Sequence, residues 1–241
     1  MLQITEKTSP EEISDYIKVV REQKGKEREA LALIDKALVY GHDFVINLFW
    51  EQALTYQHLY MNNQTNREPI NKMEQAVLTA KFYIEKYKLI KWRSRLFRFL
   101  GRISDYRGEY AKSVNFYKKS VIFSKDDPEP FRVLELDGLL SYALIMSGKI
   151  GLGYRKAKES FKDFELTEIG KILEKKDYAT WAIWRSGITM RTVEAFINKK
   201  LNFNKKEFEN WILDAEEDLS KGDFSYRKFE LKNIKQKLQE N

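Results

Sequence analysis

Residues 100–120 read LGRISDYRGEYAKSVNFYKKS, and this stretch decides the fold of the chain. Gly108 predicts a tight corner between two helices, because glycine accepts backbone conformations that other residues avoid. Ser113 and Ser120 are small residues at places where the second helix can approach the first. Tyr117 is expected to fill the groove beside them. The stretch therefore predicts two closely packed helices.

The same spacing of residues returns elsewhere in the chain. Three further anchors show it: Gly25 before Ala30, Ile34 and Ala37; Asn71 before Ala76, Ala80 and Tyr83; and Gly148 before Gly153, Ala157 and Ser160. Recurrence of a pattern along a chain indicates stacked repeats of one structural unit. The uneven spacing of the anchors predicts extra loop residues at Met61–Pro69 and Lys125–Pro130.

This pattern resembles the tetratricopeptide repeat (TPR), a helix-turn-helix of about 34 residues. The resemblance is best at residues 97–125, fair at 11–42 and 134–164, and weaker at 46–88; Ser113 and Ser120 replace alanine-type residues of the family. It implies an all-α fold, a right-handed α-solenoid of antiparallel helical hairpins with about eleven helices. We expect a single TPR-like domain over residues 1–241, in which residues 177–241 are a degenerate repeat plus a capping helix.

Capping residues and turn residues predict where the helices begin and end. Ser9 and Pro10 start the first helix, Gly41 ends the second, and Asp43 caps the third. Asp177, Asn204 and Asp223 are expected to start the later helices. The expected helices cover about residues 10–24, 26–40, 43–60, 69–87, two flanking Gly108 between 92 and 124, 130–147, 150–164, 178–198, 204–220 and from 223 onward, with a short helix or a linker at 167–175.

Composition restricts the class of protein. The chain has 241 residues, 43% of them hydrophobic, and no cysteine, which excludes disulfides, thiol nucleophiles and thiolate metal sites. The N-terminus lacks a basic region followed by an apolar run, so no signal peptide is expected. Charges interrupt every apolar stretch well before the length of a membrane span. We expect a cytoplasmic protein without membrane contact.

The positive charge is concentrated in one stretch. The net charge is +7, and residues Lys86–Arg107 contain eight basic residues and one acid, Asp105, a difference of seven. Arg95, Arg98 and Arg102 are three and four residues apart, so a helix places them on one face. Arginine binds carboxylates and phosphates in paired geometry. With few acids nearby to neutralise it, this face is expected to attract an acidic ligand, although a solvated helix face is the alternative.

In the family that this chain resembles, the first helix of each pair lines a concave groove. The resemblance implies that the groove contains the ligand-binding residues Arg95, Arg98, Arg102, Asp105, Asn47, Trp50, Gln57 and Tyr142, together with Leu54, His58, Glu135, Met146, Trp181, Trp184 and Arg191. Such a groove suits an acidic peptide or a chain terminus. The lysine and asparagine of the family's carboxylate clamp are absent, because Asp15 and Val19 occupy their places.

No catalytic motif is found in the sequence. The two histidines, His42 and His58, lack the further ligands of a metal phosphohydrolase, and Asp43 beside His42 fits the role of a helix cap better. Neither a phosphate-binding glycine loop nor a nucleophile motif is present. We therefore expect no enzyme, no catalytic residues, no metal and no cofactor.

Three functions remain open. The first is a non-catalytic protein- or peptide-binding scaffold that uses the basic and aromatic groove, with a protein or an acidic peptide as its partner. The second is binding of nucleic acid or another polyanion through the Lys86–Arg107 patch, where Trp92 and Tyr106 would stack on bases. The third is a structural subunit of a homo-oligomer or a larger complex.

Overall fold

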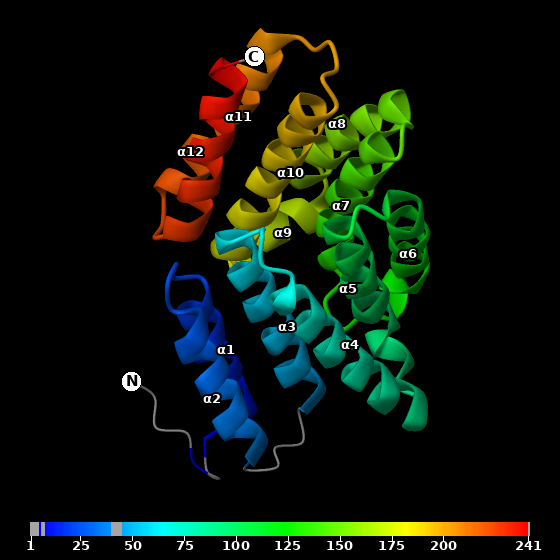
Figure 1. Cartoon of the computed structure of the whole chain (residues 1–241), viewed down its shortest axis with the longest axis vertical. Helices are drawn as coiled ribbons and strands as arrows, with labels where there is room; N and C mark the ends of the chain where they lie inside the picture. Colours follow the sequence, from blue (N-terminus) through cyan, green and yellow to red (C-terminus); the bar gives the residue numbers. More distant parts are fainter. Residues whose placement is uncertain (1–4, 6–7, 40–44, 241) are drawn as a thin grey trace. The chain divides into compact units, whose positions relative to one another are not determined.

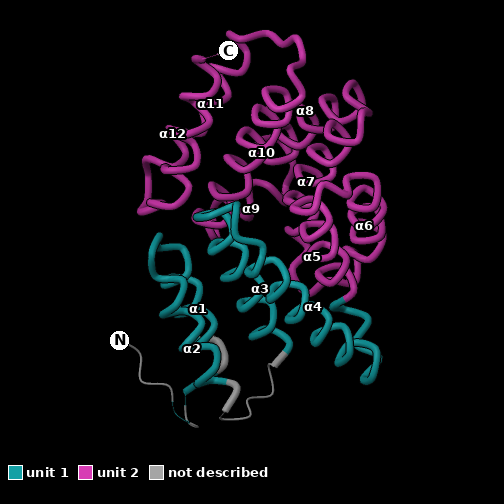
Figure 2. The backbone as a smooth tube through the Cα atoms, in the orientation of Figure 1, with its two compact units in different colours: residues 1–92 teal, residues 93–241 magenta. Residues whose placement is uncertain are grey.

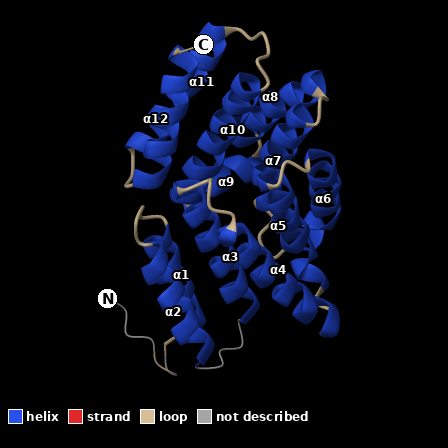
Figure 3. Ribbon diagram, in the orientation of Figure 1, coloured by secondary structure: helices blue, strands red, loops and turns tan. Residues whose placement is uncertain are grey.

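The computed structural model describes Thr5, residues 8–39 and residues 45–240, and every regular element within these ranges is a helix (Figure 3). The described residues form twelve α-helices and two 3-10 helices. The prediction of an all-helical chain is therefore confirmed. The chain divides into two compact units, residues 1–92 and 93–241, which Figure 2 distinguishes by colour. Each unit is described by itself below.

The first unit contains α1 (Pro10–Arg21), α2 (Glu27–Val39), α3 (Val45–Asn62), α4 (Glu68–Lys86) and the 3-10 helix η1 (Ile90–Trp92) (Figure 1). Its helices pack mainly on their neighbours in the chain, α1 on α2, α2 on α3 and α3 on α4, and α1 also contacts α3. Ser9 and Glu12 cap the start of α1 reciprocally, as expected for this sequence. The expected stop at Gly41 and cap at Asp43 lie outside the described residues.

The second unit contains eight α-helices. They are α5 (Arg93–Tyr106), α6 (Tyr110–Phe123), α7 (Arg132–Met146), α8 (Ile150–Leu166), α9 (Glu168–Lys176), α10 (Tyr178–Asn198), α11 (Lys205–Ser220) and α12 (Ser225–Gln239), with the 3-10 helix η2 (Ser124–Asp126) after α6. The side chains of Asp177 and Asn204 cap α10 and α11 as predicted. The last helix begins two residues after the expected Asp223.

Packing in the second unit follows the order of the chain. Helix α6 contacts α5 and α7, α8 contacts α7 and α10, and α11 contacts α10 and α12; α10 also packs on α7. The short α9 contacts α8 and α10, which makes residues 168–176 a helix rather than a linker. The largest apolar cluster combines residues of α7, α8, α10, α11 and α12. Each helix of this unit thus buries its apolar side against helices close to it in sequence.

The pair α5 and α6 has the predicted close contact. Gly108 has a φ of +75°, in the left-handed region that a corner after a helix needs. Ser113 and Ser120 are both fully buried. The Ser120 hydroxyl donates a hydrogen bond to the carbonyl oxygen of Ser94 at 2.6 Å, so the second helix lies directly on the backbone of the first.

The Asn71 anchor does not mark a corner, in agreement with the expected loop at 61–69 and the expected helix from residue 69. Asn71 lies inside α4, which begins at Glu68 with Pro69 in its first turn, and the corner falls at residues 63–67 instead. Proline is favoured in the first turn of a helix, where its missing N–H leaves no hydrogen bond unmade. The anchor position is therefore one turn inside the helix. Ala76 and Ala80 are nevertheless buried, as the repeat pattern requires.

Four helices, α4, α5, α7 and α10, end in the same backbone motif. In each, an N–H donates to the carbonyl oxygen five residues earlier at 2.9–3.0 Å: Leu89 to Ile84, Glu109 to Ser104, Lys149 to Leu144 and Leu201 to Phe196. This is the Schellman ending, and the residue before the donor is left-handed. That residue is Gly108 or Gly148 in two cases, but Lys88 (φ 53°) or Lys200 (φ 52°) in the others.

The left-handed Lys200 forms the corner between α10 and α11, and the spacing of buried residues after it can be compared with that after Gly108. Phe208, Ile212 and Ala215 are buried, at 0%, 2% and 1% exposure. They follow Lys200 by 8, 12 and 15 residues, whereas the corresponding residues follow Gly108 by 5, 9 and 12. The difference is three residues throughout. The buried residues of α11 thus have the same relative spacing as those of α6, after a corner that is three residues longer.

Candidate functional site

The row of three arginines on α5 has the expected shared face, but that face is buried. Arg95, Arg98 and Arg102 are exposed to only 6%, 3% and 4%. A buried guanidinium keeps its charge only where acidic groups and hydrogen bonds replace the water that it has lost. The surroundings of the row thus decide what it can bind.

Acidic residues of the same unit pair with all three arginines. Glu135 of α7 accepts hydrogen bonds from the guanidinium groups of both Arg98 and Arg102. Arg95 donates a hydrogen bond to Glu129, and its Nε atom lies 3.6 Å from Oδ1 of Asp127. The expectation that few acids would neutralise the row is therefore wrong. These acids belong to the turn before α7 and to α7 itself, so a search along α5 alone misses them.

Mutual charge stabilisation fixes the ionisation of this cluster. Burial by itself raises the pKa of Glu135, but the charges of Arg102 and Arg98 outweigh burial and hold that pKa well below its usual value. Glu129 shows the same balance, with Arg132 and Arg95 lowering its pKa to about 2. Burial lowers the pKa of Arg98 to about 9, against the attraction of Glu135. Arg98, Glu129 and Glu135 are therefore charged at neutral pH.

Asp105, the fourth residue predicted on this face, is held by α6. Its carboxylate accepts hydrogen bonds from the hydroxyl groups of Ser113 and, at 2.6 Å, Tyr117. Burial raises the pKa of Asp105 to about 7, although these hydrogen bonds and the nearby Arg191 and Arg102 oppose the rise. Asp105 therefore joins α5 to α6 and changes its charge near neutral pH.

The other predicted ligand residues are distributed over both units. Tyr142 lies on α7, half-buried, with its ring edge-on to Tyr110 at 6.1 Å between centroids. Asn47, Trp50 and Gln57 lie along α3 in the first unit; Trp50 and Gln57 are buried at 3% and 2% exposure, and Asn47 is half-buried. The structure thus brings Arg95, Arg98 and Arg102 together with Glu135 on α7, the helix that also bears Tyr142.

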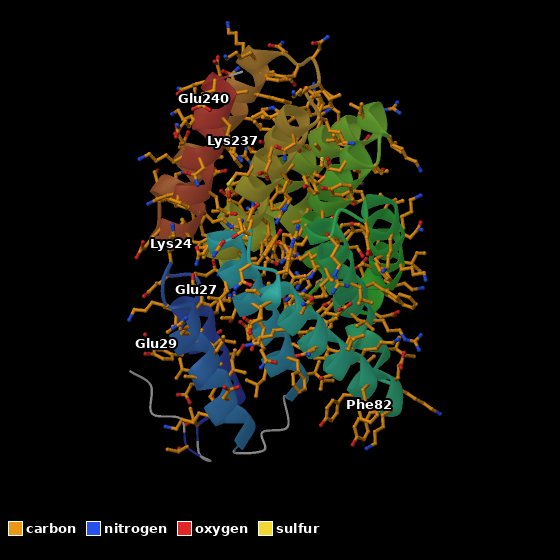
Figure 4. The ribbon with its side chains drawn as sticks, in the orientation of Figure 1. Lys24, Glu27, Glu29, Phe82, Lys237 and Glu240 are labelled. Atoms are coloured by element: carbon orange, nitrogen blue, oxygen red, sulfur yellow. The ribbon has the colours of Figure 1, made fainter. Side chains whose placement is uncertain are left out.

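The end of α4 carries an exposed surface whose lysines belong to the predicted Lys86–Arg107 patch and whose apolar side chains the sequence analysis missed. Leu78, Phe82, Tyr87 and Ile90 are exposed to 47%, 58%, 55% and 49%. Lys86, Lys88 and Lys91 are exposed among them. We call these seven residues the α4 surface. Figure 4 shows the Phe82 side chain pointing away from the helix.

Aromatic rings and lysines alternate on the α4 surface. The Lys86 ammonium lies 5.6 Å from the centroid of Phe82 and 5.2 Å from that of Tyr87. Tyr83, just beneath them, stacks on Tyr87 at 6.1 Å. The signal in the sequence is that α4 is apolar on two sides: Ala76, Ala80 and Ile84 face the core, which leaves Leu78 and Phe82 outside.

The described residues contain no group of three or more histidine, cysteine, aspartate or glutamate side chains arranged to hold a metal ion. None of the helices in the described ranges is both long enough and apolar enough to cross a membrane. No protein-family model, curated protein or solved structure matches this chain. The chemistry that the α4 surface offers is non-covalent: apolar contact, cation–π contact and attraction of negative charge.

Proposed function

We propose that this chain is a non-catalytic scaffold that binds an acidic segment of a protein partner through the α4 surface. In this proposal the fold is a TPR-like α-solenoid and the protein works in the cytoplasm. The observation that carries the proposal is the exposure of Leu78, Phe82, Tyr87 and Ile90 beside three lysines.

Apolar exposure on this scale supports a binding role. Four large apolar side chains, each about half exposed, occur within residues 78–90. Contiguous apolar surface of this kind in an otherwise well-packed protein marks a site of interaction. Aromatic residues are enriched at protein interfaces because they bury much area at little cost in conformational entropy. A partner that covers Phe82 and Tyr87 removes that area from water.

The charge of the surface selects the partner. Lys86, Lys88 and Lys91 surround the rings, and the one acid between residues 81 and 92 is Glu85. A peptide with acidic residues around an apolar anchor therefore complements the surface in charge and in polarity. The arginine row supports this partner less well, since a ligand carboxylate would have to displace Glu129 or Glu135 from buried ion pairs.

Two alternatives remain as proposals. Single-stranded nucleic acid is favoured by the alternation of lysines and rings, which includes Lys91 at 5.7 Å from the ring of Trp92. A homo-oligomer or a larger complex is favoured by the apolar area alone, since a second copy of the chain could cover it. Both use the same surface, so one set of variants separates them.

The experiment is a binding titration by fluorescence anisotropy. The probe is a labelled peptide with several glutamates around one leucine, and the variant is Phe82→Ala combined with Lys86→Ala. We expect salt-dependent binding to the wild type and about tenfold weaker binding to the variant, the loss of roughly 1.4 kcal/mol. Leu213→Ala, which removes an exposed apolar side chain of α11, is the matched control and should bind normally.

The outcomes distinguish the three functions. Tighter binding of a single-stranded oligonucleotide than of the peptide supports the nucleic-acid alternative. A dimer in light scattering that dissociates in the Phe82→Ala, Lys86→Ala variant supports the homo-oligomer. Equal peptide binding by the wild type and this variant overturns the proposal.

A further inference from the structure

A small pocket in the second unit lies apart from the arginine row. Its volume is about 210 Å³. It is lined by Lys158, Phe161, Lys162 and Glu165 of α8, Arg185 of α10, and Trp211 and Asp214 of α11. The α8 residues are spaced by three, one and three, so they share one face of that helix. Three helices that pack in sequence order thus contribute to one concavity.

Aromatic rings form the apolar wall of this pocket. Phe161 and Trp211 meet edge to face, with their centroids 4.8 Å apart. The Arg185 guanidinium lies 5.8 Å from the centroid of Phe161. Such a wall suits the methylene groups of a side chain that carries a polar end.

One nitrogen of the Arg185 guanidinium makes no hydrogen bond within the described part of the chain. Arg185 is buried, with 9% exposure, and its two terminal nitrogens donate to Asp218 and Glu165. Its Nε–H is also buried but has no hydrogen-bond acceptor within the described part of the chain. A buried donor without an acceptor is unfavourable, because it has lost its hydrogen bond to water. An acceptor that entered the pocket would remove this penalty.

Lysine side chains supply positive charge at the same pocket. Lys158 is already paired with Glu207 at 3.0 Å. Lys162 is exposed and makes no ion pair or hydrogen bond to any described residue. Glu165 and Asp214 also line the pocket, so the net charge of the lining is only +1, from three basic and two acidic residues. This balance does not favour a phosphate with two negative charges.

We infer that this pocket binds the side-chain carboxylate of a glutamate from a partner protein segment. The carboxylate accepts hydrogen bonds from Arg185 Nε–H and the Lys162 ammonium, and its methylene groups pack on Phe161 and Trp211. A volume of about 210 Å³ is below the usual range for small-molecule pockets, which begins at about 300 Å³, and fits one side chain. The site shares no residue with the α4 surface, so each can fail without the other.

The test follows the five tryptophan indole N–H signals by ¹H–¹⁵N NMR during titration with N-acetyl-glutamate N-methylamide. The Trp211 signal is assigned by its absence in Trp211→Phe. We expect this signal to shift with the glutamate probe and not with the glutamine analogue. Lys162→Ala should weaken binding about two- to fivefold, as loss of a partly exposed charge contact does.

Two control variants test whether the binding belongs to this pocket. Lys171→Ala, which removes an exposed lysine of α9, should bind as the wild type does, and so should the Phe82→Ala, Lys86→Ala variant of the α4 surface. Three results overturn the inference: no shift of Trp211, equal shifts with the glutamine analogue, or unchanged affinity in Lys162→Ala. The inference is also overturned if a crystal soaked with the probe shows only water at Arg185 Nε.

Discussion

The ring of Tyr117 on α6 lies directly against the backbone of Gly101 on α5. A Cβ atom at residue 101 would stand 2.5 Å from the Cε1 atom of that ring, closer than real Cβ contacts come. Tyr117 cannot easily move away, since it is fully buried and its hydroxyl group is bound to Asp105. The distance between α5 and α6 thus depends on the absence of a side chain at residue 101.

Gly101→Ala should therefore destabilise the protein, although alanine favours helices more than glycine does. We expect the free energy of unfolding to fall by about 1–3 kcal/mol, the usual effect of overpacking a buried contact. Urea unfolding followed by circular dichroism measures it. Gly151→Ala on α8 is the matched control, because a Cβ there has no neighbour within 4 Å. Equal stability of the two variants would show that Tyr117 has room to move.

A second prediction concerns the left-handed lysine at the end of α10. A side chain in the left-handed region costs about 1–2 kcal/mol, and glycine avoids this cost. Glycine also loses more conformational entropy on folding, which offsets part of the gain. Lys200→Gly should therefore raise the free energy of unfolding by about 0.5–1 kcal/mol. Gly148→Ala makes the opposite change at a corner where a Cβ has open space, and should lower stability. Thermal unfolding of both variants gives the comparison. A Lys200→Gly variant that is less stable than the wild type contradicts the prediction.

The third prediction is a pH dependence that originates at Asp105. Burial raises its pKa to about 7 in the folded state, above the ordinary value of 3.8. Between these values the folded protein holds a proton that the unfolded chain has released, so stability decreases as pH rises from about 4 to 7. Asp105→Asn should remove this decrease. The difference in free energy of unfolding between variant and wild type should change by at least about 1 kcal/mol from pH 5 to 7.5, given 1.36 kcal/mol for each pH unit.

Glu129 and Glu135 have the opposite dependence and serve as the internal reference. Their pKa values are lowered in the folded state, so their stabilisation is complete above about 4.5 and is lost as pH falls below it. This acid-side loss should be the same in the wild type and in Asp105→Asn. Parallel stability profiles of the two proteins between pH 5 and 7.5 would exclude Asp105 as the source of the neutral-side change.

The sequence predicts the helix pairs well because their signals are local. Gly108 and Gly148 mark corners through a backbone property of the residue itself, and Asp177 and Asn204 mark helix starts through a hydrogen bond three residues away. Lys88 and Lys200 occupy the same left-handed position without any such signal. The repeat spacing therefore misses the left-handed residue after α10, although the Asn204 cap marks the start of the next helix.

The arginine row shows why the candidate site was harder to predict. The spacing of Arg95, Arg98 and Arg102 correctly places them on one face, since this is helix geometry. Their partner Glu135 is 33 residues from Arg102, and only the packing of α5 near α7 brings the two together. Counting charges within a stretch of sequence cannot show that the acids of the next helix neutralise it.

The order of packing in the second unit has a consequence for how the unit opens. Its main helix contacts join partners at most three places apart in the chain, and α12 contacts α10 and α11. Contacts between sequence neighbours form with little loop-closure entropy, which favours fast folding. The same arrangement lets the terminal helix detach while α7 and α8 remain packed. Amide hydrogens of α12 should accordingly exchange with solvent by local opening, whereas those of α7 exchange only when the whole unit unfolds.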